Sequence, residues 1–426
     1  MILLKFFYIF PVFLFEEIFF CSNLWDVYYE IQKFDMFMKN MVDLYINNFA
    51  FGGDGTALLP DGKVCFVPGA VPGDFVRAEI ISDKKNFARA GLREIITPSH
   101  TRCKSICPHR QADVPCPSCV YAEVDYQTEL GAKQQQLEFF MRKLEPAVIH
   151  PPFPSPVRIG YRNKISLSCE NGQKGYRAAD NKTLVSVDSC PLAQPAIAER
   201  MKNDLPDDGT KRIVYRWTPA DGICRTDDPT APGLLTEQIG NNGETFHVPL
   251  QSFFQVNMAV AGELANRVLG YLKLYQPEYL VELYSGSGIF SILAAENLPY
   301  IHCTGVELDG EAVRTAGLNA GEHGVADQCR FYCDDAARFR KKIKHILPDR
   351  ALLLTDPPRT GMSKEVLAGI LELLPERIIY ISCAPDMLRR DLTVLSSRYR
   401  VLETGLLDMF PCTAHFESIT LLEKLS

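Results

Sequence analysis

Hydrophobic and polar positions follow two different patterns along this chain, and the change falls near residue 252. After that point, short apolar runs alternate with longer stretches in which apolar residues recur every three or four positions. The short runs predict strands at 280–284, 301–306, 331–335, 351–355, 377–381, 401–407 and 419–422, and the longer stretches predict helices at 259–274 and 289–296. This alternation is typical of an α/β fold with a mostly parallel sheet.

Before residue 252 the pattern predicts β structure of another kind. Gly52-Gly53-Asp54-Gly55, Pro60-Asp61-Gly62 and Pro72-Gly73-Asp74 are turn signals at a spacing of roughly ten residues. They predict a small antiparallel barrel over residues 42–100, a type that often binds single-stranded nucleic acid. Alternating residues such as 165–169 predict a further β-rich domain, which we place at 101–250, ahead of the α/β domain at 251–426.

Composition fits a globular protein of two or three domains, since 426 residues are long for one core. Residues 1–41 are expected to precede the first domain. The apolar run 6–15 is much shorter than the roughly 20 residues that cross a bilayer, and no convincing signal-peptidase site follows it. We therefore expect a cytoplasmic protein without a membrane anchor, with Met36, Met38 and Met41 as alternative starts.

The net charge of −7 gives no general support for nucleic-acid binding, but charge is uneven. Residues 81–110 contain seven basic and two acidic side chains, a local excess of five positive charges. A solvated face and a phosphate-binding patch both explain such a run.

Four of the fourteen cysteines lie within 17 positions, and the last two form a CxxC motif. Thiolates at such separations converge on one metal centre, and both zinc and an iron–sulfur cluster fit the spacing. A further thiol, Cys190, precedes Pro191. This number and placement of cysteines favour a protein of a reducing compartment over one that is held together by disulfides. The four clustered residues are Cys103, Cys107, Cys116 and Cys119.

A glycine-rich turn, Ser285-Gly286-Ser287-Gly288, follows the predicted strand 280–284, and Glu307 ends the next strand. Glycines let the backbone approach a nucleotide ligand, and a carboxylate there accepts hydrogen bonds from ribose hydroxyls. The dinucleotide pattern G-x-G-x-x-G is absent, which disfavours NAD and leaves S-adenosylmethionine as the natural cofactor. Asp356-Pro357-Pro358 at another strand end resembles the amide contact of methyltransferases that act on planar bases.

Cys383 lies at the tip of the strand 377–381, where open α/β sheets place their chemistry. For one cysteine alone, burial in the core is the more common outcome. The neighbouring motifs favour a nucleophile instead, and Cys412 is the rival thiol.

With these motifs, the sequence resembles the RNA uracil-C5 methyltransferases, in the branch with an N-terminal TRAM barrel and an iron–sulfur domain. The resemblance covers nearly everything from residue 42 onward, and four motifs carry it in order: 252–257, 356–359, 382–385 and 408–417. It implies a class I, Rossmann-like methyltransferase domain behind a TRAM/OB-like barrel and a β-rich domain that bears a cluster.

The resemblance also implies roles for individual residues. Cys383 would be the nucleophile and Glu417 the proton acceptor. A [4Fe-4S] cluster would be held by Cys107, Cys116, Cys119 and Cys190, with Cys103 as the substitute for Cys107 because eight residues separate Cys107 from Cys116. Other departures from the family pattern are Glu282, where an Asp is usual, and Pro117-Ser118 inside the CxxC. S-adenosylmethionine would contact Gln255, Tyr284, Glu307, Asp335 and Asp356.

The implied substrate is a uridine in RNA, with 23S ribosomal RNA favoured, transfer RNA as the alternative, and the enzyme a monomer. Phe253, Phe254 and Phe410 are candidates for stacking on a flipped base, with core packing as the other interpretation. His415 either orients Glu417 or packs. Two rival functions are an exocyclic-amine methyltransferase, suggested by Asp356, and an RNA-binding module on a degenerate cofactor fold.

Overall fold

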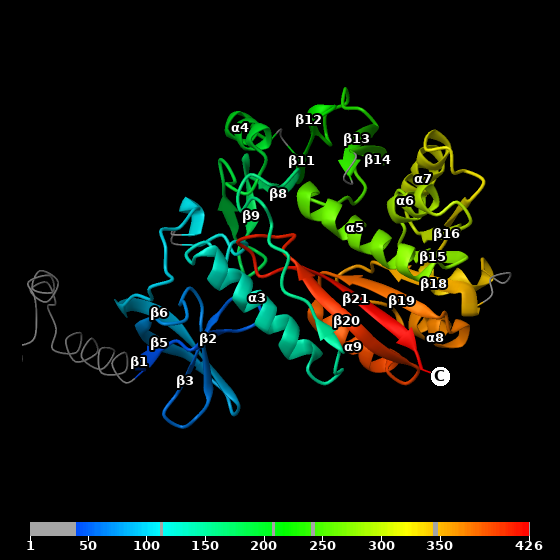
Figure 1. Ribbon diagram of the computed structural model, residues 1–426. Helices are drawn as coiled ribbons and strands as arrows, with labels where there is room; N and C mark the ends of the chain where they lie inside the picture. The colour runs from blue at the N-terminus through cyan, green and yellow to red at the C-terminus, as the bar shows by residue number, and fades with distance from the viewer. Residues whose placement is uncertain (1–39, 111–113, 207–208, 240–242, 344–347, 426) are drawn as a thin grey trace, which may run out of the picture. The chain divides into compact units, whose positions relative to one another are not determined.

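The computed structural model describes residues 40–110, 114–206, 209–239, 243–343 and 348–425 (Figure 1). The expectations about residues 1–39, including a start at Met36 or Met38, lie outside the described residues. The described chain forms two compact units. One contains residues 40–50 and 54–102, and the other contains residues 51–53 and everything from Cys103 onward.

The first unit is a six-stranded sheet in the order β1-β5-β6-β4-β3-β2, in which all neighbours are antiparallel except β4 and β6. Small residues at alternate positions, such as Val76 and Ala78, fill its core. The predicted β structure is confirmed, but the expectation of a purely antiparallel arrangement is wrong, because β4 and β6 pair in parallel. The strands are β1 (Met41–Tyr45), β2 (Asn48–Phe49), β3 (Gly55–Leu58), β4 (Val64–Val67), β5 (Phe75–Asp83) and β6 (Phe87–Thr97).

The positive charge of residues 81–110 is partly neutralised by carboxylates that lie earlier in the chain. Arg89 lies 3.3 Å from Asp54, Arg93 pairs with Glu79, and Arg102 lies 2.6 Å from the buried Asp74. Ion pairs of this kind reduce the positive potential available to phosphates. The positive potential around residues 81–110 is therefore weaker in the folded unit than the count of basic residues suggests.

Residues 164–249 of the second unit are rich in β structure. A five-stranded antiparallel sheet has the order β10-β9-β8-β11-β12, and β13 pairs with β14 beside it. Helix α4 (Pro195–Asn203) packs on β11 and β12. The strands are β8 (Lys164–Glu170), β9 (Gln173–Arg177), β10 (Leu184–Ser186), β11 (Arg212–Thr218), β12 (Gly222–Arg225), β13 (Leu234–Ile239) and β14 (Glu244–Pro249).

The second unit also contains an eight-stranded sheet, in the order β17-β16-β15-β18-β19-β21-β20-β7 (Figure 1). Its first five strands are parallel, and β21 runs antiparallel between β19 and β20. The predicted α/β fold is confirmed. The strands are β7 (Val148–Ile149), β15 (Tyr279–Leu283), β16 (His302–Glu307), β17 (Cys329–Cys333), β18 (Ala351–Thr355), β19 (Arg377–Ser382), β20 (Tyr399–Leu407) and β21 (Glu417–Lys424).

Helices cover both faces of this sheet and enclose two hydrophobic cores. Helices α5 (Met258–Tyr275) and α6 (Ile289–Asn297) contribute to one core, while α8 (Lys364–Leu373) and α9 (Pro385–Leu395) contribute to the other. Helix α7 (Gly310–Glu322) packs near β14 and β17. Short 3₁₀ turns occur at η3 (Pro108–Arg110), η4 (Ala336–Lys341) and η5 (Pro348–Arg350). Among the described residues, no helix is both long and apolar enough to cross a membrane.

Helix α3 (Tyr126–Met141) was not predicted from the sequence. It begins at Asp125, whose side chain accepts a hydrogen bond from the Thr128 amide, and it packs against α9 and β20. Three of its six buried residues are polar, so no apolar stripe marks the helix in the sequence. The buried face consists of Glu129, Leu130, Lys133, Gln136, Leu137 and Met141.

Candidate active site

The proposed site residues follow strand ends that meet at one edge of the eight-stranded sheet. The carboxyl ends of β15, β16, β18 and β19 lie side by side in register, with Leu283 paired to both Val306 and Thr355. Strand β21 runs in the opposite direction, so its first residue, Glu417, reaches the same edge. The edge therefore brings together Tyr284, Glu307, Asp356, Cys383 and Glu417, which are up to 133 positions apart in the sequence.

Cys383 and Glu417 are opposite one another at this edge. Ser382 pairs with Ser418 in the register of β19 and β21, and each candidate residue is the next one toward the edge. The thiol is half-buried, whereas Glu417 is 3% exposed. The Oε1 atom of Glu417 has no hydrogen-bond partner, an unusual state for a buried carboxylate oxygen.

Burial raises the pKa of Glu417 well above its usual value, and the nearby Asp356 carboxylate raises it further, while Arg359 opposes the shift. Burial also raises the pKa of Asp356 to about 7. Two carboxyl groups with raised pKa values at one sheet edge are typical of sites that move protons near neutral pH.

The Cys383 thiol is subject to opposing influences. Burial raises its pKa to about 12, with further contributions from Glu417 and Asp356, whereas Arg359 lowers it. Helix α9 begins at Pro385, two residues later, and the positive end of a helix dipole favours a thiolate. Arg359 and this helix terminus are therefore the groups that favour ionisation of the thiol.

The rival thiol and His415 lie deeper in the same region. Cys412 is fully buried and packs in the hydrophobic cluster that contains Cys116, Cys119 and Cys190. The ring of His415 packs edge-on against Phe410, with centroids 6.4 Å apart. Burial lowers the pKa of His415 to about 4, with further lowering by Arg359, so this side chain is neutral.

The glycine-rich turn and Glu307 fit a nucleotide cofactor. The Gly286 amide donates to Glu307 Oε2 at 3.0 Å, and the Asp309 amide donates to Oε1, which leaves lone pairs for ribose hydroxyls. The hydroxyls of Ser285 and Ser287 are buried without hydrogen-bond partners. Unsatisfied donors of this kind beside a glycine turn suit a polar ligand.

Asp335 and Tyr284 lie at the same edge. Asp335 is exposed and its side chain caps η4 by accepting from the Ala337 amide at 2.9 Å. Tyr284 has a φ of 64°, a conformation that residues with side chains rarely adopt and that clusters at functional sites.

Gln255 lies on a loop held by side chains of the central β-rich region. Asn163 donates to the Gln255 carbonyl, and Lys164 donates to the Ser252 carbonyl at 3.0 Å. The buried Arg216 donates to the carbonyls of residues 249 and 250 and pairs with Glu237 at 3.0 Å. These side chains therefore hold the loop by hydrogen bonds to its carbonyl groups.

The three aromatic candidates differ in exposure. Phe253 is 73% exposed, whereas Phe254 is 5% exposed and belongs to the interior. Phe410 is half-buried and packs against the core formed around α5 and α6. Of the three, Phe253 is the one with a ring face free for stacking.

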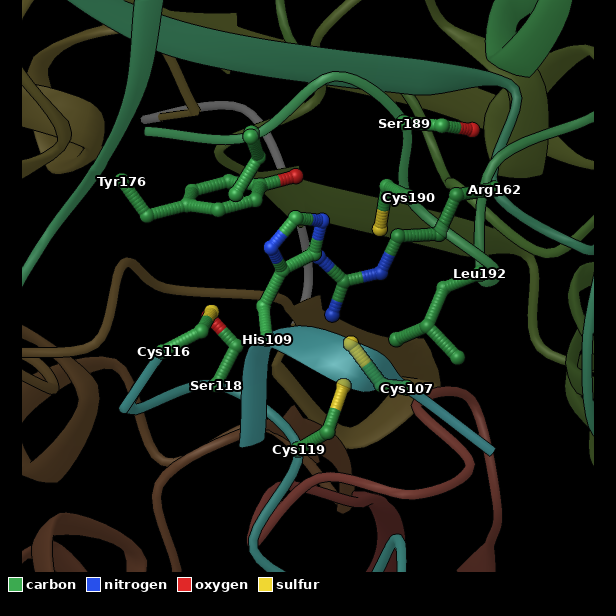
Figure 2. Close-up of a pocket in the computed structure, with 11 residues that line it drawn as sticks. Cys107, His109, Cys116, Ser118, Cys119, Arg162, Tyr176, Ser189, Cys190 and Leu192 are labelled. Atoms are coloured by element: carbon green, nitrogen blue, oxygen red, sulfur yellow. The ribbon is translucent and has the colours of Figure 1, made fainter. Parts of the chain in front are cut away.

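The four cysteines named for a cluster, Cys107, Cys116, Cys119 and Cys190, line one small cavity (Figure 2). Their donor chemistry fits an iron–sulfur cluster, and all four are buried. The exposed Cys103 is not among the lining residues. Figure 2 also shows the side chains of His109 and Arg162 directed into this cavity.

The free space in the cavity is about 10 Å³, so a cluster would require these two side chains to move. In the part of the chain that the structure describes, no three His, Cys, Asp or Glu side chains are arranged to hold a metal ion. The donor set therefore fits a cluster, and the present geometry does not form a metal centre.

Comparisons with known proteins find similarity to RNA methyltransferases. The family model described as tRNA (Uracil-5-)-methyltransferase matches residues 235–425, and the TRAM domain model matches residues 42–92. The chain is 29% identical to the 23S rRNA (uracil(1939)-C(5))-methyltransferase RlmD of Methylococcus capsulatus, over 89% of this chain and 96% of that protein. It is 27% identical to the tRNA (uracil(54)-C(5))-methyltransferase of Schizosaccharomyces pombe, over 90% of this chain and 78% of that protein.

A solved structure shows the same fold. The tRNA (uracil-54, C5)-methyltransferase of Pyrococcus abyssi, solved in complex with S-adenosyl-L-homocysteine, aligns with a TM-score of 0.68 and 22% identity. The alignment covers 89% of this chain and 100% of that one. Residues 235–425 of this chain are thus similar to the tRNA (uracil-5-)-methyltransferase family, and residues 42–92 are similar to the TRAM domain.

Proposed function

We propose that the protein methylates carbon 5 of a uridine in RNA with S-adenosylmethionine as methyl donor. The observation that carries the proposal is the pairing of Cys383, beside a helix N-terminus and Arg359, with the unpartnered buried carboxylate of Glu417. Relatives that match this chain over most of its length are named as uracil-C5 methyltransferases of RNA.

The chemistry requires a nucleophile because carbon 5 of uracil attacks a methyl group poorly. The Cys383 thiolate adds to carbon 6, which forms an S–C bond and converts the ring into an enolate. S-adenosylmethionine, when bound, supplies the methyl group, which leaves its sulfonium sulfur for carbon 5. Glu417 then takes the proton from carbon 5, and the electrons of that C–H bond restore the ring double bond and expel the Cys383 thiolate.

The residues at the sheet edge divide the remaining tasks. Gln255, Tyr284, Glu307 and Asp335 would hold the cofactor, and Asp356 would lie between the cofactor and the base. Arg359 and the α9 terminus would favour the thiolate of Cys383. Neutral His415 would pack against Phe410 without exchanging protons near neutral pH.

The uridine has to leave its stack to reach Cys383, which costs on the order of a few kcal/mol in a duplex and less in a loop. The exposed ring of Phe253 is our candidate for stacking on the extruded base or its neighbour. The TRAM domain supplies a further surface for RNA.

We favour 23S ribosomal RNA as the substrate, because relatives named for that reaction match nearly their whole length. Transfer RNA is the second candidate, and the fission-yeast relative and the Pyrococcus structure favour it. Both assignments imply a cytoplasmic protein, and we expect a monomer in solution.

We also propose that Cys107, Cys116, Cys119 and Cys190 hold a [4Fe-4S] cluster, with zinc as the alternative. The proposal is supported by the four thiols lining one cavity and by the exclusion of Cys103 from it. When bound, such a cluster would cross-link the segment 107–119 to Cys190.

The test is a methylation assay with purified protein, S-adenosylmethionine and fragments of both RNA classes, followed by mass-spectrometric mapping of 5-methyluridine. RNA that carries 5-fluorouridine has no proton for Glu417 to remove, so it should trap a denaturant-stable adduct through Cys383. Methylation of an exocyclic amine, or no transfer to either RNA, would refute the proposal.

A further inference from the structure

The loop between β20 and β21, residues 408–416, delivers Glu417 to the active-site edge. Its flanking residues, Leu407 and Glu417, pair directly with each other across the two strands. Four consecutive carbonyl groups of the loop accept hydrogen bonds from other segments. The donors are Asn257 to residue 409, Lys133 to residue 410, Tyr161 to residue 411 and the Tyr121 amide to residue 412.

Within this loop, Cys412 has a φ of 68°, which is unfavourable for a residue with a side chain. Such a conformation persists only where the surroundings fix it. The Cys412 amide donates to Glu129 Oε1 at 2.6 Å, so helix α3 holds the strained residue directly.

Helix α3 reaches the loop through a fully buried group of three charges, Lys133, Glu129 and Asp408. Lys133 Nζ donates to Glu129 Oε1 and to Asp408 Oδ1, each at 2.7 Å. Asp408 also accepts from the Tyr126 hydroxyl at 2.8 Å, and Arg158 pairs with Glu129 at 2.9 Å. Two positive and two negative side chains therefore balance in this region.

Apolar side chains of similar size usually stabilise a core at least as well as buried ion pairs do. The charges here differ from apolar packing in one respect, because their hydrogen bonds have defined directions and therefore fix how loop 408–416 is oriented against α3. They join the Asp408 side chain and the backbone of residues 410 and 412 to one face of α3, and none of these hydrogen bonds involves β19 or Cys383.

We propose that Lys133, with Glu129 and Asp408, is a positioning group for the general base, and that it holds loop 408–416 so that Glu417 faces carbon 5 of the bound uridine. The inference rests on the proposed function. It separates two steps of the reaction. Adduct formation depends on Cys383, which the triad does not contact, whereas proton removal depends on Glu417.

The test uses the double variant Lys133→Met/Asp408→Asn, which keeps the Glu129–Arg158 pair and leaves no unpaired buried charge. We expect kcat to fall at least about tenfold, a part of the roughly 10²–10⁴ that a placed general base contributes. The KM for S-adenosylmethionine should stay within about twofold. The denaturant-stable protein–RNA adduct should accumulate with unmodified uridine, because its resolution is slowed.

Tyr126→Phe and Tyr399→Phe form a matched pair that tests the same idea if the double variant does not fold. Each change removes one hydroxyl that donates at 2.8 Å, to Asp408 in the first case and to the Pro375 carbonyl in the second. Only Tyr126→Phe should lower kcat and increase the adduct.

Several outcomes would overturn the inference. They are a folded double variant with kcat within about twofold of wild type, a parallel rise in KM for the cofactor, loss of activity without adduct, or equal effects of the two tyrosine changes. If the wild-type enzyme itself transfers no methyl group to RNA, the proposed function fails instead.

Discussion

The Ser418 hydroxyl donates a hydrogen bond to the Ser382 carbonyl at 3.0 Å and locks the ends of β19 and β21 together. Both serines are buried, so this bond is shielded from water. It fixes the next residues on each strand, Cys383 and Glu417, as neighbours. The proposed nucleophile and the proposed proton acceptor thus share one sheet edge, which would keep both within reach of a single uracil ring.

Replacing Cys383 by Ala should abolish methyl transfer and leave cofactor binding within about threefold of wild type, because the proposed cofactor contacts lie on other segments. Calorimetry with S-adenosylmethionine and a methylation assay measure the two properties. Cys65→Ala is the matched control, since that thiol is buried in the core of the first unit. An active Cys383→Ala enzyme would favour the exocyclic-amine reaction.

Glu417→Gln should make thermal stability less dependent on pH. The folded protein raises the pKa of Glu417, so it binds more protons than the unfolded chain between the unfolded value, about 4.5, and the raised value. Wild-type stability therefore falls as pH rises through that window, by about 1.4 kcal/mol for each pKa unit crossed. Melting temperatures at pH 5 and pH 8 should converge in the variant.

Glu423→Gln provides a control of opposite sign. Arg400 and Arg377 lower the pKa of Glu423, so its ion pairs stabilise the protein above the unfolded pKa and are lost as pH falls. This variant should lose stability at pH 8 and approach wild type in acid. The same pH response in both variants would contradict a raised pKa for Glu417.

Arg359→Gln should shift the pH–rate profile toward higher pH. Arg359 lowers the pKa of the Cys383 thiol, so its removal reduces the thiolate fraction at neutral pH, by about tenfold for each pKa unit. The rate should recover as pH rises. Arg398→Gln, an exposed change next to β20, should leave the profile unchanged, and a uniform loss at every pH would assign Arg359 to binding instead.

Cys119→Ser should remove bound iron and sulfide from protein purified without oxygen, whereas Cys103→Ser should retain both. Cys119 lines the cavity and Cys103 is exposed outside it. Iron and sulfide analysis with visible absorbance checks the result. Zinc in place of iron, or equal loss in both variants, would contradict the proposed ligand set.

Phe253→Ala should weaken RNA binding by roughly tenfold, within the 1–3 kcal/mol typical of base stacking, without changing the melting temperature. Phe254→Ala should instead lower stability, by about 3–5 kcal/mol, because that ring is buried. Fluorescence anisotropy and thermal unfolding separate the two effects. Unchanged RNA affinity in Phe253→Ala would remove the stacking role.

The sequence alone determined the features that local periodicity encodes. Apolar runs and glycine turns predicted seven strands of the eight-stranded sheet and helices α5 and α6, and they placed Cys383 and Glu307 at strand tips. These predictions succeeded because a strand's burial and its terminating turn depend on neighbouring residues.

Tertiary structure decided the contacts that join distant segments. Lys133 and Asp408 are 275 positions apart. The buried polar residues of α3 can be interpreted only once the loop that they bind is known. Likewise, the choice of Cys107 over Cys103 as a cavity residue and the neutralisation of Arg89 and Arg93 depend on chain packing. A local pattern cannot show these features, because each charge is stable in its place only through a partner that the fold brings to it.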